Sequence, residues 1–135
     1  MKVLVDTSVW SRAFRRRAPQ DDEAVAELRR LIGHGRAALV GPIRQELLSG
    51  IRERAGFERL RDALRAFTDE TIEVADYERA ADMFNACRAK GVQGSNTDFL
   101  LCAISERHRF PILTTDGDFA RFGRVIPVAL HKAPA

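Results

Sequence analysis

The sequence of 135 residues has few of the side chains that disulfides and soft metals require. Its two cysteines, Cys87 and Cys102, lie on separate predicted helices and form no CxxC pair, so we expect two reduced, buried thiols. Its three histidines are scattered and show no ligand spacing. These absences argue against a disulfide scaffold and against zinc chemistry.

Long apolar runs are also absent. No stretch approaches the ~18 residues that span a bilayer, and the N-terminus lacks the apolar core and cleavage site of a signal peptide. The composition, 45% hydrophobic and 30% charged, is typical of a soluble globular protein. We therefore expect a cytoplasmic protein without membrane contact, in which residues 1–135 form a single domain.

Positive charge is concentrated in the first half of the chain. The net charge is only +3, but residues 1–68 carry 14 basic and 9 acidic side chains, whereas residues 69–135 carry 8 and 10. The run "RAFRRR" contributes Arg12, Arg15, Arg16 and Arg17. It is either a solvated arginine-rich surface or an edge that binds phosphate groups.

Five short apolar segments predict β-strands at 2–6, 37–41, 71–75, 111–114 and 125–130. Helical patterns separate these segments, and the helix predicted at 97–108 is apolar on nearly every side. Apolar strands that alternate with helices indicate an α/β fold with a parallel sheet covered on both faces. Ligands of such sheets bind at the carboxyl ends of the strands, so polar residues there are the candidates for function.

Acidic residues from four distant segments follow the predicted strand ends. Asp6 ends the first strand, Glu46 lies one turn inside the helix after the second, Asp98 opens the apolar helix, and Asp116 follows the fourth strand. Each has a structural alternative: a helix cap for Asp6, an exposed helical acid for Glu46, a helix-dipole partner for Asp98, and an Asx turn for Asp116 with Asp118. Taken together, these alternatives do not explain why the acids gather at one edge of one sheet.

A cluster of carboxylates requires positive charge, and the segments around Asp6, Asp98 and Asp116 contain no basic residue close in sequence. Oxygen ligands without histidine or cysteine favour Mg²⁺ or Mn²⁺, ions that bind phosphate oxygens and activate water. The pattern therefore predicts phosphodiester hydrolysis. In "TTDGDF" the threonines can orient the carboxylates, and Gly117 is predicted to aim both aspartates inward through its freedom of φ.

Four motifs, in this order and spacing, resemble those of PIN-domain ribonucleases, and specifically VapC-type toxins of toxin–antitoxin pairs. The matching segments are "VLVDTSVW" with Asp6, Thr7 and Ser8, "GPIRQELLSGIR" with Glu46, "NTDFLLCAIS" with Asp98, and "LTTDGDF" with Thr114, Thr115, Asp116 and Asp118.

This resemblance implies a three-layer α/β/α sandwich with a parallel five-stranded sheet of order 3-2-1-4-5. It also implies a Mg²⁺-dependent endoribonuclease, with Mn²⁺ as a substitute, that acts on tRNA or rRNA, forms a homodimer and is inhibited by a VapB-like antitoxin. The implied catalytic residues are Asp6, Glu46, Asp98 and Asp116, of which Asp6, Asp98 and Asp116 bind the metal. Asp118 is an additional acid, Thr7, Ser8, Thr114 and Thr115 support the carboxylates, and Arg12, Arg15, Arg16 and Arg17 are candidates for RNA binding.

Two other classes of function are alternatives to a nuclease: a phosphotransfer domain and a non-catalytic domain. A phosphatase of the haloacid-dehalogenase type needs an aspartate pair after the first strand, and a receiver domain needs an acid pair there, but position 8 is serine. Lys132 offers the lysine that a receiver places after its last strand, yet the acid pair is missing. A non-catalytic RNA-binding or scaffold domain is expected to lack one or more of the acids, and none is lost.

Overall fold

The structure is a computed structural model that describes residues 1–14 and 22–134. Its first half contains β1 (Val3–Val5), α1 (Thr7–Ala13), α2 (Glu23–Gly33), β2 (Ala37–Ala38), α3 (Gly41–Leu48) and α4 (Arg54–Leu64). Its second half contains α5 (Val74–Ala89), α6 (Asn96–His108), β3 (Ile112–Leu113) and α7 (Asp118–Phe122).

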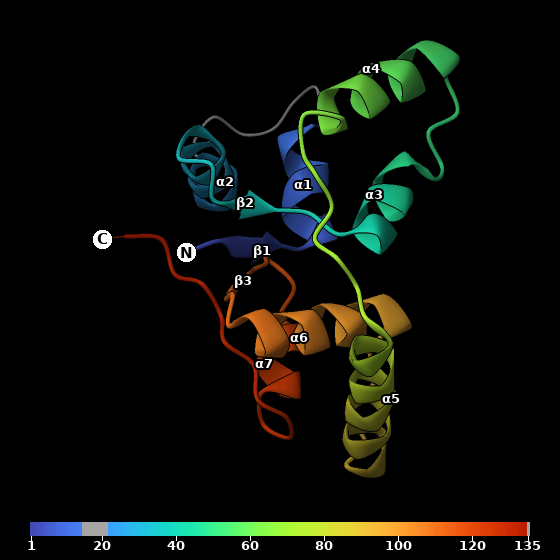
Figure 1. The fold of residues 1–135 in the computed structure, drawn as a ribbon, viewed down its shortest axis with the longest axis vertical. Helices are drawn as coiled ribbons and strands as arrows, with labels where there is room; N and C mark the ends of the chain where they lie inside the picture. The colour runs from blue at the N-terminus through green and yellow to red at the C-terminus, as the bar shows by residue number, and fades with distance from the viewer. Residues whose placement is uncertain (15–21, 135) are drawn as a thin grey trace.

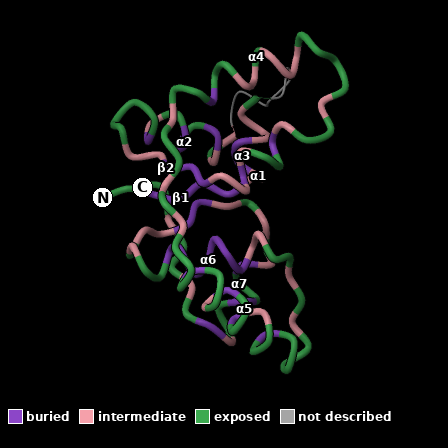
Figure 2. The backbone as a smooth tube through the Cα atoms, turned by 45° about the vertical axis from the view of Figure 1, so that its right-hand side comes forward, coloured by how far each residue is buried: buried purple, intermediate pink, exposed green. Residues whose placement is uncertain are grey.

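A parallel sheet of order β2-β1-β3 forms the centre of the fold. In its register Leu4 pairs with Ala38 on one side and with Ile112 on the other. All three residues of β1 are fully buried, and Figure 2 shows the buried positions running along the central strands. A strand buried on both faces explains why "VLV" is apolar throughout instead of alternating with polar residues.

Helices cover both faces of the sheet. In Figure 1, α1, α2 and α3 lie on one side of the strands, whereas α5, α6 and α7 lie on the other. Trp10 of α1 is completely buried, and its indole nitrogen donates to the carbonyl of Val5 over 3.1 Å. This bond holds the first helix tightly against the strand that precedes it. The predicted three-layer α/β/α arrangement with a parallel sheet is thereby confirmed.

The prediction of five strands is wrong for the two outer positions. Segments 71–75 and 125–130 are not strands, and each outer pairing is reduced to a single bridge, Leu39 with Asp69 and Ile112 with Leu130. These bridges sit beside β2 and β3, so the predicted 3-2-1-4-5 neighbours are present as bridges only.

Local chemistry explains both failures. The carbonyl of Thr71 accepts a hydrogen bond from Arg107 instead of joining a ladder, and the amide of Glu73 donates to Asp76 at the start of α5. In the segment 125–130, Pro127 has no amide proton to donate, which limits ladder formation. The amides of Val125 and Ile126 donate to the carbonyl of Phe122 instead of to β3, and backbone bonds to Ile112 come only from Ala129 and His131 among the described residues.

No helix in the described ranges is long and apolar enough to cross a membrane.

Cys87 and Cys102 are both buried and free, and burial raises the pKa of the Cys102 thiol to about 12.

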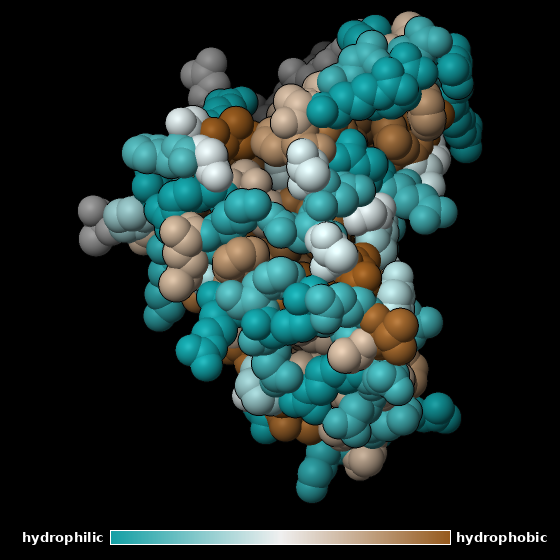
Figure 3. Space-filling view, in the orientation of Figure 1, coloured by the Kyte–Doolittle hydropathy of each residue, from teal (hydrophilic) through white to brown (hydrophobic). Residues whose placement is uncertain are grey.

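The helix α4 projects from the body of the molecule (Figure 1), and hydrophilic side chains cover most of its visible surface (Figure 3).

Candidate active site

Asp6 lies at the carboxyl end of β1, where the chain turns into α1, and is 7% exposed. Although it occupies the position before the helix, its side chain makes no capping bond to the helix backbone. Instead its Oδ2 accepts hydrogen bonds from the hydroxyls of Ser8 and Thr114, both over 2.8 Å. The structural alternative of a helix cap therefore fails for Asp6, whose partners are neutral hydroxyls from two separate segments.

These hydroxyls tie the ends of β1 and β3 together. The amide of Thr115 donates to Ser8 Oγ over 3.2 Å, and the amide of Asp116 donates to Thr114 Oγ1 over 2.9 Å. Thr114 thus contacts Asp6 through its proton and Asp116 through its oxygen. Because one threonine joins both carboxylate-bearing segments, the positions of Asp6 and Asp116 are coupled.

Glu46 lies in α3 and is exposed. Its Oε2 accepts a hydrogen bond from the hydroxyl of Thr7 in α1, over 2.8 Å. This contact spans 39 residues of sequence and directs an otherwise ordinary surface glutamate toward the end of β1.

Asp98 lies in the first turn of α6 and is engaged in a capping box with Ser95. Ser95 Oγ accepts from the amide of Asp98, and Asp98 Oδ2 accepts from the amide of Ser95, each over 3.1 Å. Burial raises the pKa of Asp98, the bonds to Ser95 act in the opposite direction, and the charges of Asp6 and Asp116 raise the pKa further. The structural role that the sequence allowed is real, but Asp98 also lies within the electrostatic influence of the other two acids.

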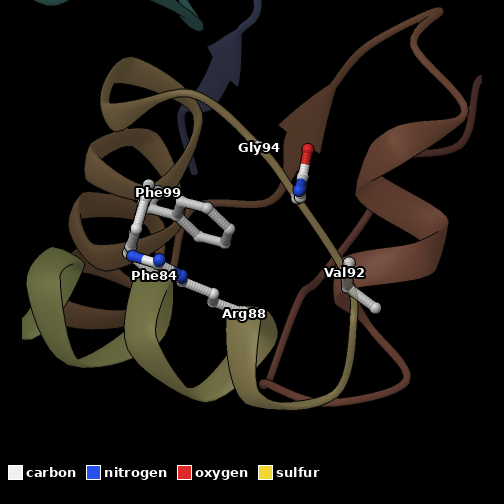
Figure 4. Close-up of a pocket in the computed structure, with 6 residues that line it drawn as sticks. Phe84, Arg88, Val92, Gly94 and Phe99 are labelled. Atoms are coloured by element: carbon white, nitrogen blue, oxygen red, sulfur yellow. The ribbon is translucent and has the colours of Figure 1, made fainter.

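The loop before Asp98 is fixed by close packing at Gly94. A Cβ atom at this position would lie 2.4 Å from the ring of Phe122 and 3.0 Å from that of Phe99. Gly94 also borders a cavity of about 230 Å³ with Phe84, Arg88 and Phe99 (Figure 4). The absence of a side chain at Gly94 lets the loop approach these rings, and this approach positions Ser95 and the start of α6.

Asp116 and Asp118 form a turn of their own. The amide of Asp118 donates to Asp116 Oδ1 over 2.8 Å, while Asp118 forms an ion pair with Arg121 one helical turn later. Gly117 has an ordinary helical φ of −64°, so the prediction that it aims the two acids through unusual backbone freedom is wrong. The Asx turn is present, and Arg121 partners Asp118.

The four main acids share one pattern of contacts. In each, one carboxylate oxygen accepts a hydrogen bond from a neutral donor, and the hydrogen bonds of the described residues leave the other oxygen without a protein partner: Asp6 Oδ1, Glu46 Oε1, Asp98 Oδ1 and Asp116 Oδ2. Across residues 1–14 and 22–134, no ion pair with lysine, arginine or histidine involves these acids.

This donor set fits a hard divalent cation in its chemistry, because it consists of oxygen atoms with uncompensated negative charge. In the arrangement seen, however, the described part of the chain contains no group of three acidic, histidine or cysteine side chains close enough to hold a metal ion. Coordination by three of the acids therefore requires their side chains to rotate inward from the positions seen here.

Of the four arginines predicted to bind RNA, the structure describes Arg12. Arg12 donates to Asp22, the residue that caps α2, over 2.8 Å. Arg15, Arg16 and Arg17 fall outside the described residues.

Sequence reasoning missed two contacts of the acids. Arg121 lies three residues after Asp118, a helical spacing that indicates an ion pair. The partnership of Thr7 with Glu46 had no signal in sequence, since it joins two helices that follow different strands.

The four acids occur in the order expected of a PIN domain, and a parallel sheet places them. The model of the PIN domain family matches residues 3–125. The chain belongs to the PIN domain family. The family predicted from the four motifs is thereby confirmed, and the PIN match contains all the predicted site residues.

Among solved structures, this PIN domain is similar to a chain in the crystal structure of FitAcB from Neisseria gonorrhoeae. The TM-score is 0.68 at 22% sequence identity, and the similarity covers 96% of each chain. At this identity the likeness establishes the shared fold over nearly the whole chain. No curated protein gives a significant match.

Proposed function

We propose that this PIN domain is a Mg²⁺-dependent endoribonuclease, with Mn²⁺ as a substitute, formed by residues 1–135 as a single domain. PIN domains are generally nucleases, which supports hydrolysis of phosphodiester bonds. The single observation that carries the proposal is the set of carboxylates at the carboxyl ends of the strands, each anchored by a neutral donor and none paired with a cation among the described residues.

In this proposal Asp6, Asp98 and Asp116 hold the metal through the carboxylate oxygens that their anchoring bonds leave available. A bound divalent cation supplies charge neutralisation at phosphate oxygens and a more acidic water. The hydroxyls of Ser8 and Thr114 orient Asp6 by donating to its other oxygen.

Glu46 is proposed to accept a proton from the attacking water at Oε1. The Thr7 hydroxyl occupies Oε2 and fixes the rotation of the carboxylate, so the remaining oxygen is the basic one. Glu46 lies further from β1 along its helix than the other acids and has a longer side chain, which suits a role in proton transfer better than one in tight coordination.

The test is cleavage of total tRNA and rRNA by the purified protein in EDTA, followed by addition of Mg²⁺ or Mn²⁺. Cleavage must require the added cation and must be lost in Glu46→Gln, which keeps the hydrogen bond to Thr7 but not the base. Cleavage that persists in chelator would contradict the metal-dependent mechanism.

We further propose that the protein is the toxin of a toxin–antitoxin pair, a cytoplasmic homodimer that cleaves tRNA or rRNA and is inhibited by a VapB-like antitoxin. The resemblance of the four motifs to VapC-type toxins supports this role. An acidic site of this kind favours a basic antitoxin residue that stands in for the cation. Induced expression should arrest growth, and co-expression of a cognate antitoxin should restore it; normal growth on induction would argue against a toxin.

A further inference from the structure

A second cavity, of about 330 Å³, lies at the same edge of the molecule as the acids. It is bounded by Pro42 in the first turn of α3, by Tyr77 and Ala81 on α5, and by Thr97 and Leu100 on α6. In Figure 1 the N-terminal ends of α5 and α6 meet on the side where β1 ends. The cavity therefore opens beside the carboxyl ends of the strands.

Two helices carry both lining residues of the cavity and acids of the candidate site. Pro42 and Glu46 are four residues apart on α3, so they lie on the same face about one helical turn, or ~5.4 Å, apart. On α6 the lining residues Asn96 and Thr97 immediately precede Asp98. An RNA chain bound with a phosphate at the acids can therefore place a neighbouring group at this opening.

The lining combines flat apolar walls with a few polar groups. Tyr77, the only tyrosine in the sequence, is 56% exposed, and its ring stacks on no other aromatic ring in the described ranges. Pro42 and Leu100 add apolar surface, and the exposed Asn96 adds an amide that can both donate and accept. Stacking surfaces with an amide at one end match the faces and edge of a nucleobase.

We propose that this cavity binds a nucleobase of the RNA next to the phosphate that is cleaved, with Tyr77 as the stacking surface and Asn96 as the partner of the base edge. The inference rests on the proposed nuclease function. The cavity of Figure 4 is less suited to this role, because its Phe99 is only 1% exposed and forms an edge-to-face contact with the ring of Phe84, the other aromatic residue of the lining.

Binding of base and backbone can be separated without cleavage. All proteins in the experiment carry Asp6→Asn, so that RNA remains intact, and the probes are fluorescein-labelled octamers of adenylate, of uridylate and of abasic ribose phosphate. Fluorescence anisotropy gives each dissociation constant in Mg²⁺. The ratio between abasic and base-containing octamers reports base contacts, since all three probes share the same phosphate charges.

We expect Tyr77→Ala to weaken binding of a base-containing octamer roughly five- to a hundredfold while leaving the abasic octamer unchanged. Tyr77→Phe should retain the preference because it keeps the ring. Val74→Ala is the matched control: Val74 is exposed one turn earlier on α5 but does not line the cavity.

An unchanged ratio in Tyr77→Ala would overturn the proposal. If the same variant also altered the oligomeric state in sedimentation velocity, the surface would be a contact between protein chains instead of a base site. Because the octamers are bound and not cleaved, failure here leaves the nuclease proposal standing, and a protein that cleaves no RNA could still show the base preference.

Discussion

Two sets of carboxylates in this small domain differ in what compensates their charge. Asp76, at the start of α5, is 2% exposed, and both of its oxygens accept hydrogen bonds from Arg107 over 2.7 and 2.9 Å. Asp6, at the end of β1, is 7% exposed, and within the described ranges its side-chain partners are only the hydroxyls of Ser8 and Thr114. The burial of the two acids is similar, but among the residues that the structure describes only Asp76 has a cation beside it.

The pKa directions show the consequence. Burial alone would raise the pKa of Asp76, but the hydrogen bonds and charge of Arg107 outweigh it and lower the pKa overall. For Asp98 burial is again the largest cause, and the neighbouring acids add to it, so the pKa is raised. The fold thus pairs its structural acids with arginine and leaves the acids at the strand ends to repel one another.

This difference is informative because several other acids of this protein are paired with arginine. Glu27, Asp69 and Glu106 are each paired with one, like Asp76. Unpaired acids at one edge therefore indicate a place for an external cation, which lowers the mutual repulsion when it binds.

The largest effect is expected from Asp6→Asn. Losing one carboxylate should reduce RNA cleavage by on the order of 10³-fold, since the cation that neutralises phosphate charge is no longer held. The amide also removes a repelling charge, so the thermal midpoint of the metal-free protein should be equal or higher. Cleavage assays and a melting curve in EDTA check both parts; a strongly destabilised variant would indicate that Asp6 is structural.

Asp76→Asn should reduce stability and leave activity unchanged, in contrast to Asp6→Asn. We expect a loss of about 3 kcal/mol in the free energy of unfolding, because Arg107 loses its charged partner at a buried position. Cleavage per folded molecule should not change. Urea denaturation beside the cleavage assay measures this, and a catalytic defect at unchanged stability would erase the distinction between the two sets of acids.

Glu27→Gln tests the paired acids by pH. Hydrogen bonds from Arg30 and His131 lower the pKa of Glu27 to about 2, against the opposing effect of burial. Ionised Glu27 therefore stabilises the fold fully above its ordinary pKa of 4.5, and this contribution is lost as the pH falls toward 2. The variant should lose about 2–3 kcal/mol at pH 7 and show a flatter stability profile between pH 4.5 and 2. Parallel stability profiles for the wild type and the variant between pH 4.5 and 2 would contradict a stabilising role of ionised Glu27.

Gly94→Ala tests whether the unpaired acids are positioned by packing instead of ion pairs. A Cβ at Gly94 must displace the buried ring of Phe122, so we expect a loss of about 1–3 kcal/mol in stability. Gly33→Ala is the control, because nothing lies within 4 Å of a Cβ there. Equal midpoints in denaturant for the two variants would mean that the loop before Asp98 adapts freely.

Among the acids near the strand ends, the smallest effect on activity is expected from Asp118→Ala. Arg121 already neutralises Asp118, so it is less available to a cation than Asp116. The variant should retain measurable cleavage, whereas Asp98→Ala and Asp116→Ala should lose it at every Mn²⁺ concentration. Metal titration of each variant by calorimetry accompanies the assay. If Asp118→Ala binds Mn²⁺ as poorly as Asp116→Ala, Asp118 is a direct ligand.

The central part of the fold was predictable because local signals agreed there. The run "VLV" is short, apolar and followed at once by Asp6, and the structure has β1 at Val3–Val5. The outer strands failed because their fate depends on distant partners: Arg107 takes the carbonyl of Thr71, and Pro127 interrupts the last segment. No local pattern reports a hydrogen bond from a helix 36 residues away.

For the site, strand-end positions identified the acids, while their partners followed different rules. The hydroxyls in "VDTS" and "TTDGD" lie close enough in sequence to the acids for their bonding to be anticipated. The spacing of Asp118 and Arg121 is a helical one and indicates an ion pair. The expectation of an unusual φ at Gly117 was wrong, because the hydrogen bond between Asp118 and Asp116 forms with an ordinary helical φ at Gly117.

We propose that the unpaired acids, unlike the paired ones, form a binding site for a divalent cation. Calorimetric titration of Mn²⁺ into the wild-type protein, Asp6→Asn and Glu27→Gln tests it most directly. We predict saturable binding to the wild type and to folded Glu27→Gln, and a loss of at least about tenfold in affinity in Asp6→Asn. Equal binding by all three proteins, or no binding by the wild type, would contradict a cation site at the unpaired acids.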